Sequence, residues 1–344
     1  MKLPTGKLPP DLLRDLLASL PSNDPSVVVG GAVGEDAAVL DTAVPDSGNT
    51  DLLVVKTDPI TFVASDTGHY LLAVNGNDLA TMGAEPRWLL VTALLPEGIE
   101  SGRAQQIFQD VAAACAETGV SLVGGHTEIT VGLDRPILVG CLLGTVARGR
   151  LVRTSGAQPG DAVLLAGGIA IEGTAILATE HAATLLGKGV DAPIIARAGG
   201  WLRSPGISVA PAAKALQSAV RVHSMHDPTE GGLATALHEL AEAAGVGLRI
   251  DRSAIAVLPE CEAVCQALGL DPLGLLASGA LLATVAARDT DAALESLRAA
   301  EVPAQAIGEV LAGDAGLILA AGDFQRPIPT FPRDELARFL ESGS

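Results

Sequence analysis

The sequence has 344 residues, of which 48% are hydrophobic and 18% are charged, and its net charge is −18 at pH 7. This apolar content excludes a disordered chain, and the length predicts two domains. The acidic charge argues against a general surface for nucleic acid or anionic membranes. Aromatic residues make up only 2%, which also argues against base-stacking platforms, so we expect no nucleic-acid partner.

The N-terminal sequence MKLPTGKLPPDLLRDLL lacks the uninterrupted apolar segment of a signal peptide. No run of 18 or more apolar residues follows, so we expect no membrane-spanning helix and no membrane partner. Four cysteines in 344 residues do not form a disulfide scaffold. These features together predict a cytoplasmic protein.

Helices and strands are predicted to alternate through the first half of the chain. Apolar residues at helical spacing predict helices at 11–20, 68–82 and 101–117. Apolar and β-branched runs predict strands at 27–29, 37–40, 52–57, 88–95, 120–123 and 137–146. Clustered glycines predict a turn between the first two strands and another at Gly124-Gly125.

The second half repeats this alternation after a connector rich in Ser, Gly and Pro at 154–161. Strands are predicted at 162–166, 281–285 and 306–310, and helices at 172–183, 211–220, 230–244, 290–300 and 333–341. The pattern predicts an α/β (α+β) chain with domains at residues 1–153 and 154–344.

No P-loop, dinucleotide fingerprint or nucleophile elbow occurs. Acidic residues instead recur at strand ends and glycine turns, namely Asp36, Asp58, Asp78, Glu128 and Asp227. Each of them alone is also compatible with a helix cap or a turn, and Asp227 could cap the helix that begins near Glu230. Asp78 is different, because it lies in an apolar helical run, where an unpaired carboxylate is unfavourable. Since magnesium prefers carboxylates and bridges to phosphates, the group predicts a metal–triphosphate site.

Two further residues leave alternatives open. His126 lies between a glycine pair and Glu128, and it is the best functional candidate among the histidines. Glu172 follows another glycine-rich turn, which could either contact phosphate or serve strand-to-helix packing. The spacing of His223 and His226 is not accompanied by a cysteine pair, so zinc is not supported.

The motifs GEDAAVLD, VKTD, VNGNDLATMGAEP, VGGHTEIT, GxxxEGT and HDPTEGGL occur in the order and spacing of the AIR synthase superfamily, which the chain resembles from Gly6 to about Pro332. The segments DPTEGGLATALHE and LGLDPLGLLASGALLATV are most similar to its HypE branch of hydrogenase maturation and AIR synthase related proteins. The resemblance implies a two-domain fold. Its N-terminal α/β domain would contribute strands to a β-barrel across a homodimer, and a C-terminal α/β domain would lie beside it.

The resemblance also implies ATP and Mg²⁺ as cofactors. Transferred by motif, the metal ligands are Asp36, Asp58, Asp78 and Asp227. The nucleotide-binding residues are Lys7, Gly34, Glu35, Thr57, Asn77, Gly124, Gly125 and Thr127. Several relatives carry an acid where this chain has His126, so either Glu128 or His126 is the candidate acid/base.

The implied reaction is phosphoryl transfer from ATP to an amide- or carbamoyl-type oxygen of an unidentified acceptor, either a small molecule or protein-borne. No cysteine follows Cys265, so we do not expect the HypE reaction on the chain's own terminal cysteine. The first cysteine is Cys115, which argues against selenophosphate synthesis. Two alternatives stay open, a small-molecule kinase resembling thiamine-monophosphate kinase and a non-catalytic nucleotide-binding partner in metal-centre assembly.

Overall fold

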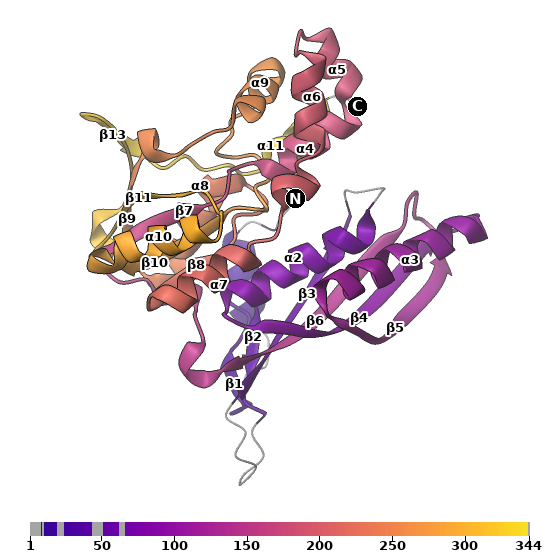
Figure 1. The fold of residues 1–344 in the computed structure, drawn as a ribbon, viewed down its shortest axis with the longest axis horizontal. Coiled ribbons are helices and arrows are strands. Elements are labelled where there is room, and N and C mark those ends of the chain that lie inside the picture. The colour runs from indigo at the N-terminus through magenta and orange to yellow at the C-terminus, as the bar shows by residue number, and fades with distance from the viewer. Residues whose placement is uncertain (1–7, 9, 19–23, 43–50, 62–65, 343–344) are drawn as a thin grey trace. The chain divides into compact units, whose positions relative to one another are not determined.

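The computed structural model describes residues 8, 10–18, 24–42, 51–61 and 66–342 (Figure 1). The chain divides into two compact units. Ser22–Gly30 and Asp36–Leu151 form the N-terminal unit, whereas Met1–Pro21, Gly31–Glu35 and Val152–Ser344 form the C-terminal unit. The main division lies between Leu151 and Val152. The domains expected at residues 1–153 and 154–344 stay a prediction.

The N-terminal unit is a six-stranded sheet with two helices on one face (Figure 1). The strand order is β1 (Val27–Val29), β2 (Ala38–Leu40), β3 (Asp51–Ile60), β6 (Ile137–Ala147), β4 (Glu85–Pro96) and β5 (Ser121–Thr130). Helix α2 (Thr67–Thr81) packs on β3 and β6 and against α3 (Ser101–Thr118). Burial alternates along β6, as the period of two in a half-buried strand requires. The strands predicted between residues 27 and 146 and the helices predicted at 68–82 and 101–117 are present with shifted ends. Residues 19–20 of the helix predicted at 11–20 lie outside the described residues.

The predicted turn at Gly124-Gly125 is wrong, because β5 runs straight through both glycines. Gly125 has a φ of +147°, and a Cβ added to it would lie 1.9 Å from the carbonyl oxygen of Val91 on β4. The register of β4 against β5 shifts nearby, between Leu89 and Leu90. Glycine here permits a bulge and close contact between two strands, which in sequence looks the same as a turn.

The C-terminal unit is built on a seven-stranded sheet. Its order is β13 (Phe324–Pro327), β12 (Leu317–Ala321), β9 (Gly247–Asp251), β11 (Ala304–Leu311), β7 (Asp161–Ala166), β10 (Leu281–Ala286) and β8 (Val222–His226). All neighbours are antiparallel except β12 and β9. Helix α8 (Gly232–Ala244) buries its predicted apolar face, including Leu233, Leu237 and Leu240, in the core with β7, β9 and β10. Strands β8, β9, β12 and β13 were not predicted from the sequence.

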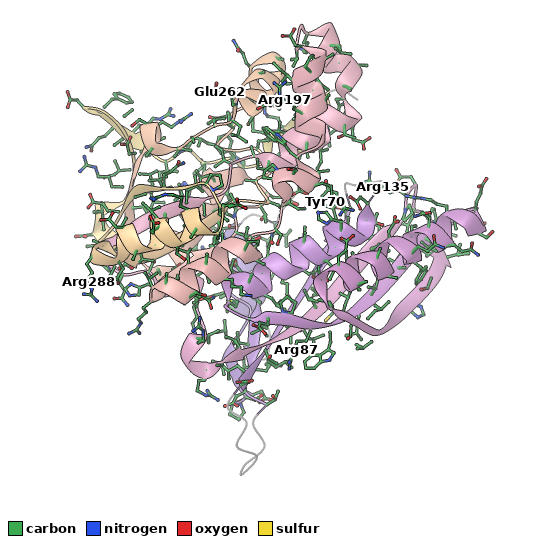
Figure 2. The ribbon with its side chains drawn as sticks, in the orientation of Figure 1. Tyr70, Arg87, Arg135, Arg197, Glu262 and Arg288 are labelled. Atoms are coloured by element: carbon green, nitrogen blue, oxygen red, sulfur yellow. The ribbon has the colours of Figure 1, made fainter. Side chains whose placement is uncertain are left out.

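The other helices of this unit are α1 (Pro10–Ala18), α4 (Ile171–Glu180), α5 (Ala182–Gly187), α6 (Ala192–Gly199), α7 (Ala210–Ala219), α9 (Pro259–Leu268), α10 (Thr290–Ala299) and α11 (Glu335–Ser342). The single helix predicted at 172–183 is two helices, which meet at His181. Arg197 of α6, labelled in Figure 2, donates a 2.6 Å hydrogen bond to Glu260 and so joins α6 to α9.

Helix α1 and the segment Gly31–Glu35 group with the C-terminal unit, although the expected N-terminal domain included them. Arg14 of α1 pairs with Glu242 of α8. A Cβ added to Gly34 would lie 2.6 Å from the carbonyl oxygen of Glu239 on α8, and Gly34 has a φ of +86°. Glycine therefore allows this segment to lie directly against the helix.

The α/β class and the two-part architecture predicted from the sequence are confirmed. Within the described part of the chain, every helix is too short or too polar to cross a bilayer. The cytoplasmic location stays a prediction.

Candidate functional site

Two predicted metal ligands of the N-terminal unit, Asp58 and Asp78, converge on one cationic group. The Lys56 ammonium lies 3.3 Å from an Oδ2 atom of each carboxylate. The two oxygens are therefore no further apart than twice that distance. Asp78 is only 6% exposed, and Lys56 is a partner of the kind that such burial requires.

The geometry follows from the period of a strand. Lys56 and Asp58 are two residues apart on β3, so their side chains share the face on which α2 packs. Lys56 was not among the predicted site residues, although its spacing from Asp58 is a signal by which it could be found in the sequence. Asp78 comes from the last turn of α2, and only packing brings it opposite β3.

Asn75 of α2 links this helix to strand β3 next to Lys56, Asp58 and Asp78. Its Oδ1 accepts a 2.9 Å hydrogen bond from the backbone N–H of Asp58, and its Nδ2 donates to the carbonyl of Leu71 at 2.9 Å. A Cβ on Gly140 of β6 would lie 2.8 Å from this Nδ2, so glycine is needed there for close packing. Asn75 is fully buried, and it anchors Asp58 to the helix that carries Asp78.

Most of the other predicted residues of this unit lie on α2, β3 and β5. Asn77 is buried in α2, and Thr57 donates its hydroxyl to the carbonyl of Gly140 at 2.7 Å. His126 and Glu128 lie 3.3 Å apart on β5, with side chains 65% and 51% exposed. Strands β6 and β4 separate β5 from β3, a distance of about 14 Å at the usual strand spacing.

The predicted nucleotide contacts Gly124, Gly125 and Thr127 lie on the same exposed strand β5. The structure therefore does not gather the VGGHTEIT motif with Asp58 and Asp78 inside one unit. Lys7 lies outside the described residues.

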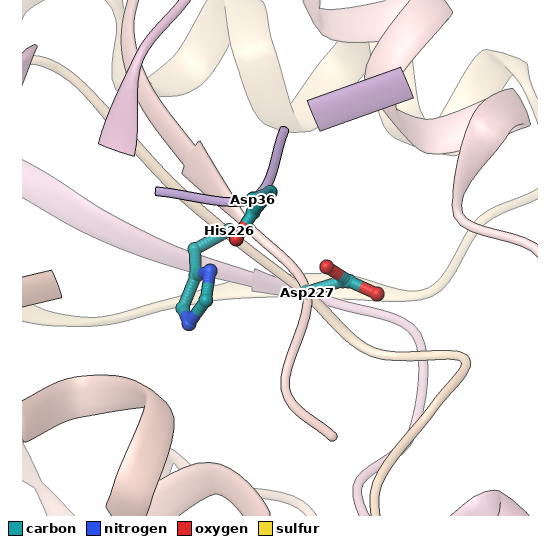
Figure 3. Close-up of side chains that lie close together, drawn as sticks. All are labelled: Asp36, His226 and Asp227. Atoms are coloured by element: carbon teal, nitrogen blue, oxygen red, sulfur yellow. The ribbon is translucent and has the colours of Figure 1, made fainter. Parts of the chain in front are cut away.

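In the C-terminal unit, Asp227 directly follows β8 and is 3% exposed. Its neighbour His226 ends the strand, and its Nε2 lies 3.0 Å from Glu239 Oε2 on α8. The two side chains leave the backbone in different directions (Figure 3). Helix α8 begins at Gly232, with Gly231 at its N-cap, so Asp227 does not cap the helix.

Gly34 and Glu35 belong to the same unit and lie near α8. Glu35 Oε1 accepts a 3.3 Å hydrogen bond from the backbone N–H of Ser155, and its Oε2 is buried without a hydrogen bond. Gly34 contacts Glu239, the residue that also bonds His226. Asp36, the next residue in the chain and also drawn in Figure 3, is 6% exposed and belongs to the N-terminal unit.

A second group of acids in the C-terminal unit is deeply buried. The pKa of Glu172, in the first turn of α4, is raised to about 7, mainly by burial and also by the charges of Asp334 and Glu230, while a hydrogen bond with Ser278 opposes the rise. Burial also raises the pKa of Asp334 to about 6. Glu172 had two possible roles from its sequence context, and Asp334 was not among the predicted site residues.

Asp334 fixes the DPTEGG segment, residues 227–232. Its Oδ2 accepts a 2.7 Å hydrogen bond from the backbone N–H of Gly231, and its Oδ1 accepts one from Leu336 at 2.7 Å. A Cβ on Gly232 would lie 2.5 Å from the carbonyl oxygen of Leu273, so the segment is also closely packed. The loop after β8 is therefore held in place from both sides.

Comparisons with known proteins agree with these motifs. Residues 34–146 match the N-terminal domain, and residues 158–319 the C-terminal domain, of the AIR synthase related protein family. A carbamoyl dehydratase HypE of Cupriavidus necator is 36% identical over 269 residues, which are 76% of this chain and 72% of the relative.

Two further similarities extend over more of the chain. A putative hydrogenase expression/formation protein of Methanocaldococcus jannaschii is 29% identical over 300 residues, 85% of this chain and 84% of the relative. The crystal structure of a hydrogenase maturation protein HypE in complex with ATP superposes with a TM-score of 0.70. It is 25% identical and covers 92% of both chains.

Proposed function

We propose a function from the premise that this chain belongs to the AIR synthase related family, within the HypE group. The chain is an ATP- and Mg²⁺-dependent enzyme that transfers the terminal phosphoryl group of ATP to an amide- or carbamoyl-type oxygen of an acceptor. The relative named carbamoyl dehydratase and the HypE structure with ATP support this assignment. In this chain the proposal depends on one observation, namely that the carboxylates of Asp58 and Asp78 both contact the ammonium of Lys56.

The donor set around that cation fits magnesium. Carboxylate oxygens are the protein ligands that Mg²⁺ prefers. The ammonium of Lys56 shows that a positive charge at this position contacts the carboxylates of both Asp58 and Asp78. Bound Mg²⁺ would supply charge neutralisation at the triphosphate. Asp58 and Asp78 would hold it, and Asp36 and Asp227 stay the further predicted ligands.

The residues of this chain contribute positioning more than covalent chemistry. In a dehydration, the acceptor oxygen takes the phosphoryl group, its bond to carbon breaks as phosphate leaves, and the two protons on nitrogen are removed as a nitrile forms. Glu128 or His126 stays the predicted acid/base for those protons. The buried Asn75 and Asp334 keep the carboxylate-bearing segments in place.

The test of this function is an assay of the purified chain with Mg²⁺, ATP and carbamoyl-bearing thiols or amides. We expect acceptor-dependent phosphate release, with an acceptor product that has lost one water by mass spectrometry. A recovered acceptor that has gained a phosphoryl group would instead establish a small-molecule kinase. ATP binding without turnover for any acceptor would support the non-catalytic alternative.

We also propose that the chain forms a homodimer through β5. This strand is the edge of its sheet and is exposed along almost its whole length. Leu122, Val123 and Ile129 are 44%, 55% and 65% exposed, and Trp88 on the neighbouring strand β4 is 38% exposed. An apolar edge strand of this length pairs readily with another chain, so a second copy would cover it.

The Ile129→Asp variant is expected to be monomeric, because the new carboxylate would have to be buried in this interface. Light scattering after size exclusion would show half the mass of the wild type. Leu186→Asp, at a 52% exposed site on α5, is the matched control and should leave the mass unchanged. A wild-type monomer, or a dimeric Ile129→Asp variant, would contradict the proposal.

A further inference from the structure

Lys56 is the cation that balances Asp58 and Asp78 in this structure. The side chains of Lys56, Asp58 and Asp78 are 24%, 30% and 9% exposed, so the group is largely withdrawn from water. These three side chains together carry a net charge of −1. The pair is therefore stabilised without a metal, although it still attracts a further cation.

The carboxylates are less free to move than the lysine. Asn75 holds the backbone of Asp58, and Asp78 is fixed in the last turn of α2. Lysine carries a compact charge on a flexible four-carbon stem, so its ammonium can move without any change in the backbone. A divalent ion that binds both carboxylates must displace the ammonium, because the two positive charges would otherwise repel each other at close range.

We propose that Lys56 occupies the place of a divalent cation and so makes metal binding depend on nucleotide. This inference rests on the proposed function, since the displaced ammonium needs an anion to receive it. The phosphates of a bound nucleotide are such an anion, and lysine is a common phosphate ligand. Metal and nucleotide then each promote the binding of the other, as linkage between two sites requires.

The test is calorimetric titration of Mn²⁺ into the full chain, with and without a nonhydrolysable ATP analogue. Without nucleotide, the Lys56→Met variant is expected to bind Mn²⁺ about tenfold more tightly than the wild type, a typical size of such coupling. Nucleotide should raise the Mn²⁺ affinity of the wild type, and this gain should be about tenfold smaller in the Lys56→Met variant. Lys56→Arg, which keeps the charge, should behave like the wild type.

Two controls show where the effect arises. Lys214→Met removes an exposed lysine on α7 and should leave both Mn²⁺ affinities unchanged. Asp78→Asn combined with Lys56→Met should abolish the gain, because one of the two carboxylates is lost. Thermal unfolding of each variant reports whether it is folded, and Lys56→Gln replaces Lys56→Met if that variant does not fold.

The inference is overturned if removal of the Lys56 charge leaves Mn²⁺ affinity without nucleotide unchanged or weaker, which is the result expected of a merely structural ion pair. That result is distinct from failure of the proposed function. A wild type without ATP turnover in which Lys56→Met still strengthens Mn²⁺ binding contradicts the enzymatic proposal alone. A wild type with turnover and no such strengthening contradicts the role of Lys56 alone.

Discussion

The Asp78→Asn variant is expected to lose ATP turnover by about a thousandfold while it keeps its fold, in line with the loss of a key electrostatic group from an active site. The substitution removes the charge of one of the two carboxylates that converge on Lys56. Asparagine has nearly the same shape, and Lys56 keeps its pairing with Asp58. The free energy of unfolding should therefore change by only about 1 kcal/mol.

Phosphate release measures the turnover, and circular dichroism with thermal unfolding measures the fold. Asp134→Asn is the matched control in the same unit, because the Asp134 side chain is 91% exposed. It should retain wild-type turnover. Wild-type turnover in the Asp78→Asn variant would refute the assignment of Asp78 as a metal ligand.

The Glu172→Gln variant is expected to raise the free energy of unfolding by about 3 kcal/mol at pH 8 and to leave it nearly unchanged below pH 4.5. Burial raises the pKa of Glu172 from 4.5 to about 7 in the folded chain. The folded state thus binds this proton more tightly than the unfolded state does. The resulting stability is complete below pH 4.5 and is lost as the pH rises through 7, whereas glutamine has no proton to lose.

Urea unfolding at several pH values between 4 and 8 measures this difference. Glu180→Gln, at the exposed end of the same helix, should follow the wild type. The wild type and the Glu172→Gln variant should both still lose stability as the pH rises through about 6, because the pKa of Asp334 is also raised. A Glu172→Gln variant less stable than the wild type at pH 8 would mean that the folded chain stabilises the ionised Glu172.

Several elements were predictable because their signals are local. The apolar faces of α2, α3 and α8 and the β-branched run of β3 appear in the sequence at the period of their own secondary structure. Polar residues in β8 (VHSMH) removed that signal, so the strand that leads into Asp227 was not identified. The glycine pair of β5 predicts a turn when only the sequence is considered, because its contact with Val91 is a property of two paired strands.

The candidate site also has features that the sequence predicts and features that only packing decides. The need of Asp78 for a partner followed from the sequence, because a carboxylate in an apolar helical run is costly wherever the helix lies. That the partner is Lys56 was decided by the packing of α2 on β3, which no local pattern encodes. The separation of His126 and Glu128 from Asp58 was likewise decided by strand order.

The sequence by itself determined the strongly periodic helices and strands, the family motifs and the carboxylates that need a counter-charge, since periodicity and side-chain chemistry are carried by neighbouring residues. Only the tertiary structure decided which groups meet. The placement of Lys56 between Asp58 and Asp78, and the raised pKa of Glu172 near Asp334, depend on distances and burial between residues far apart in the chain. Electrostatic interactions depend on those distances and on exclusion of water, which arise only when the chain has folded.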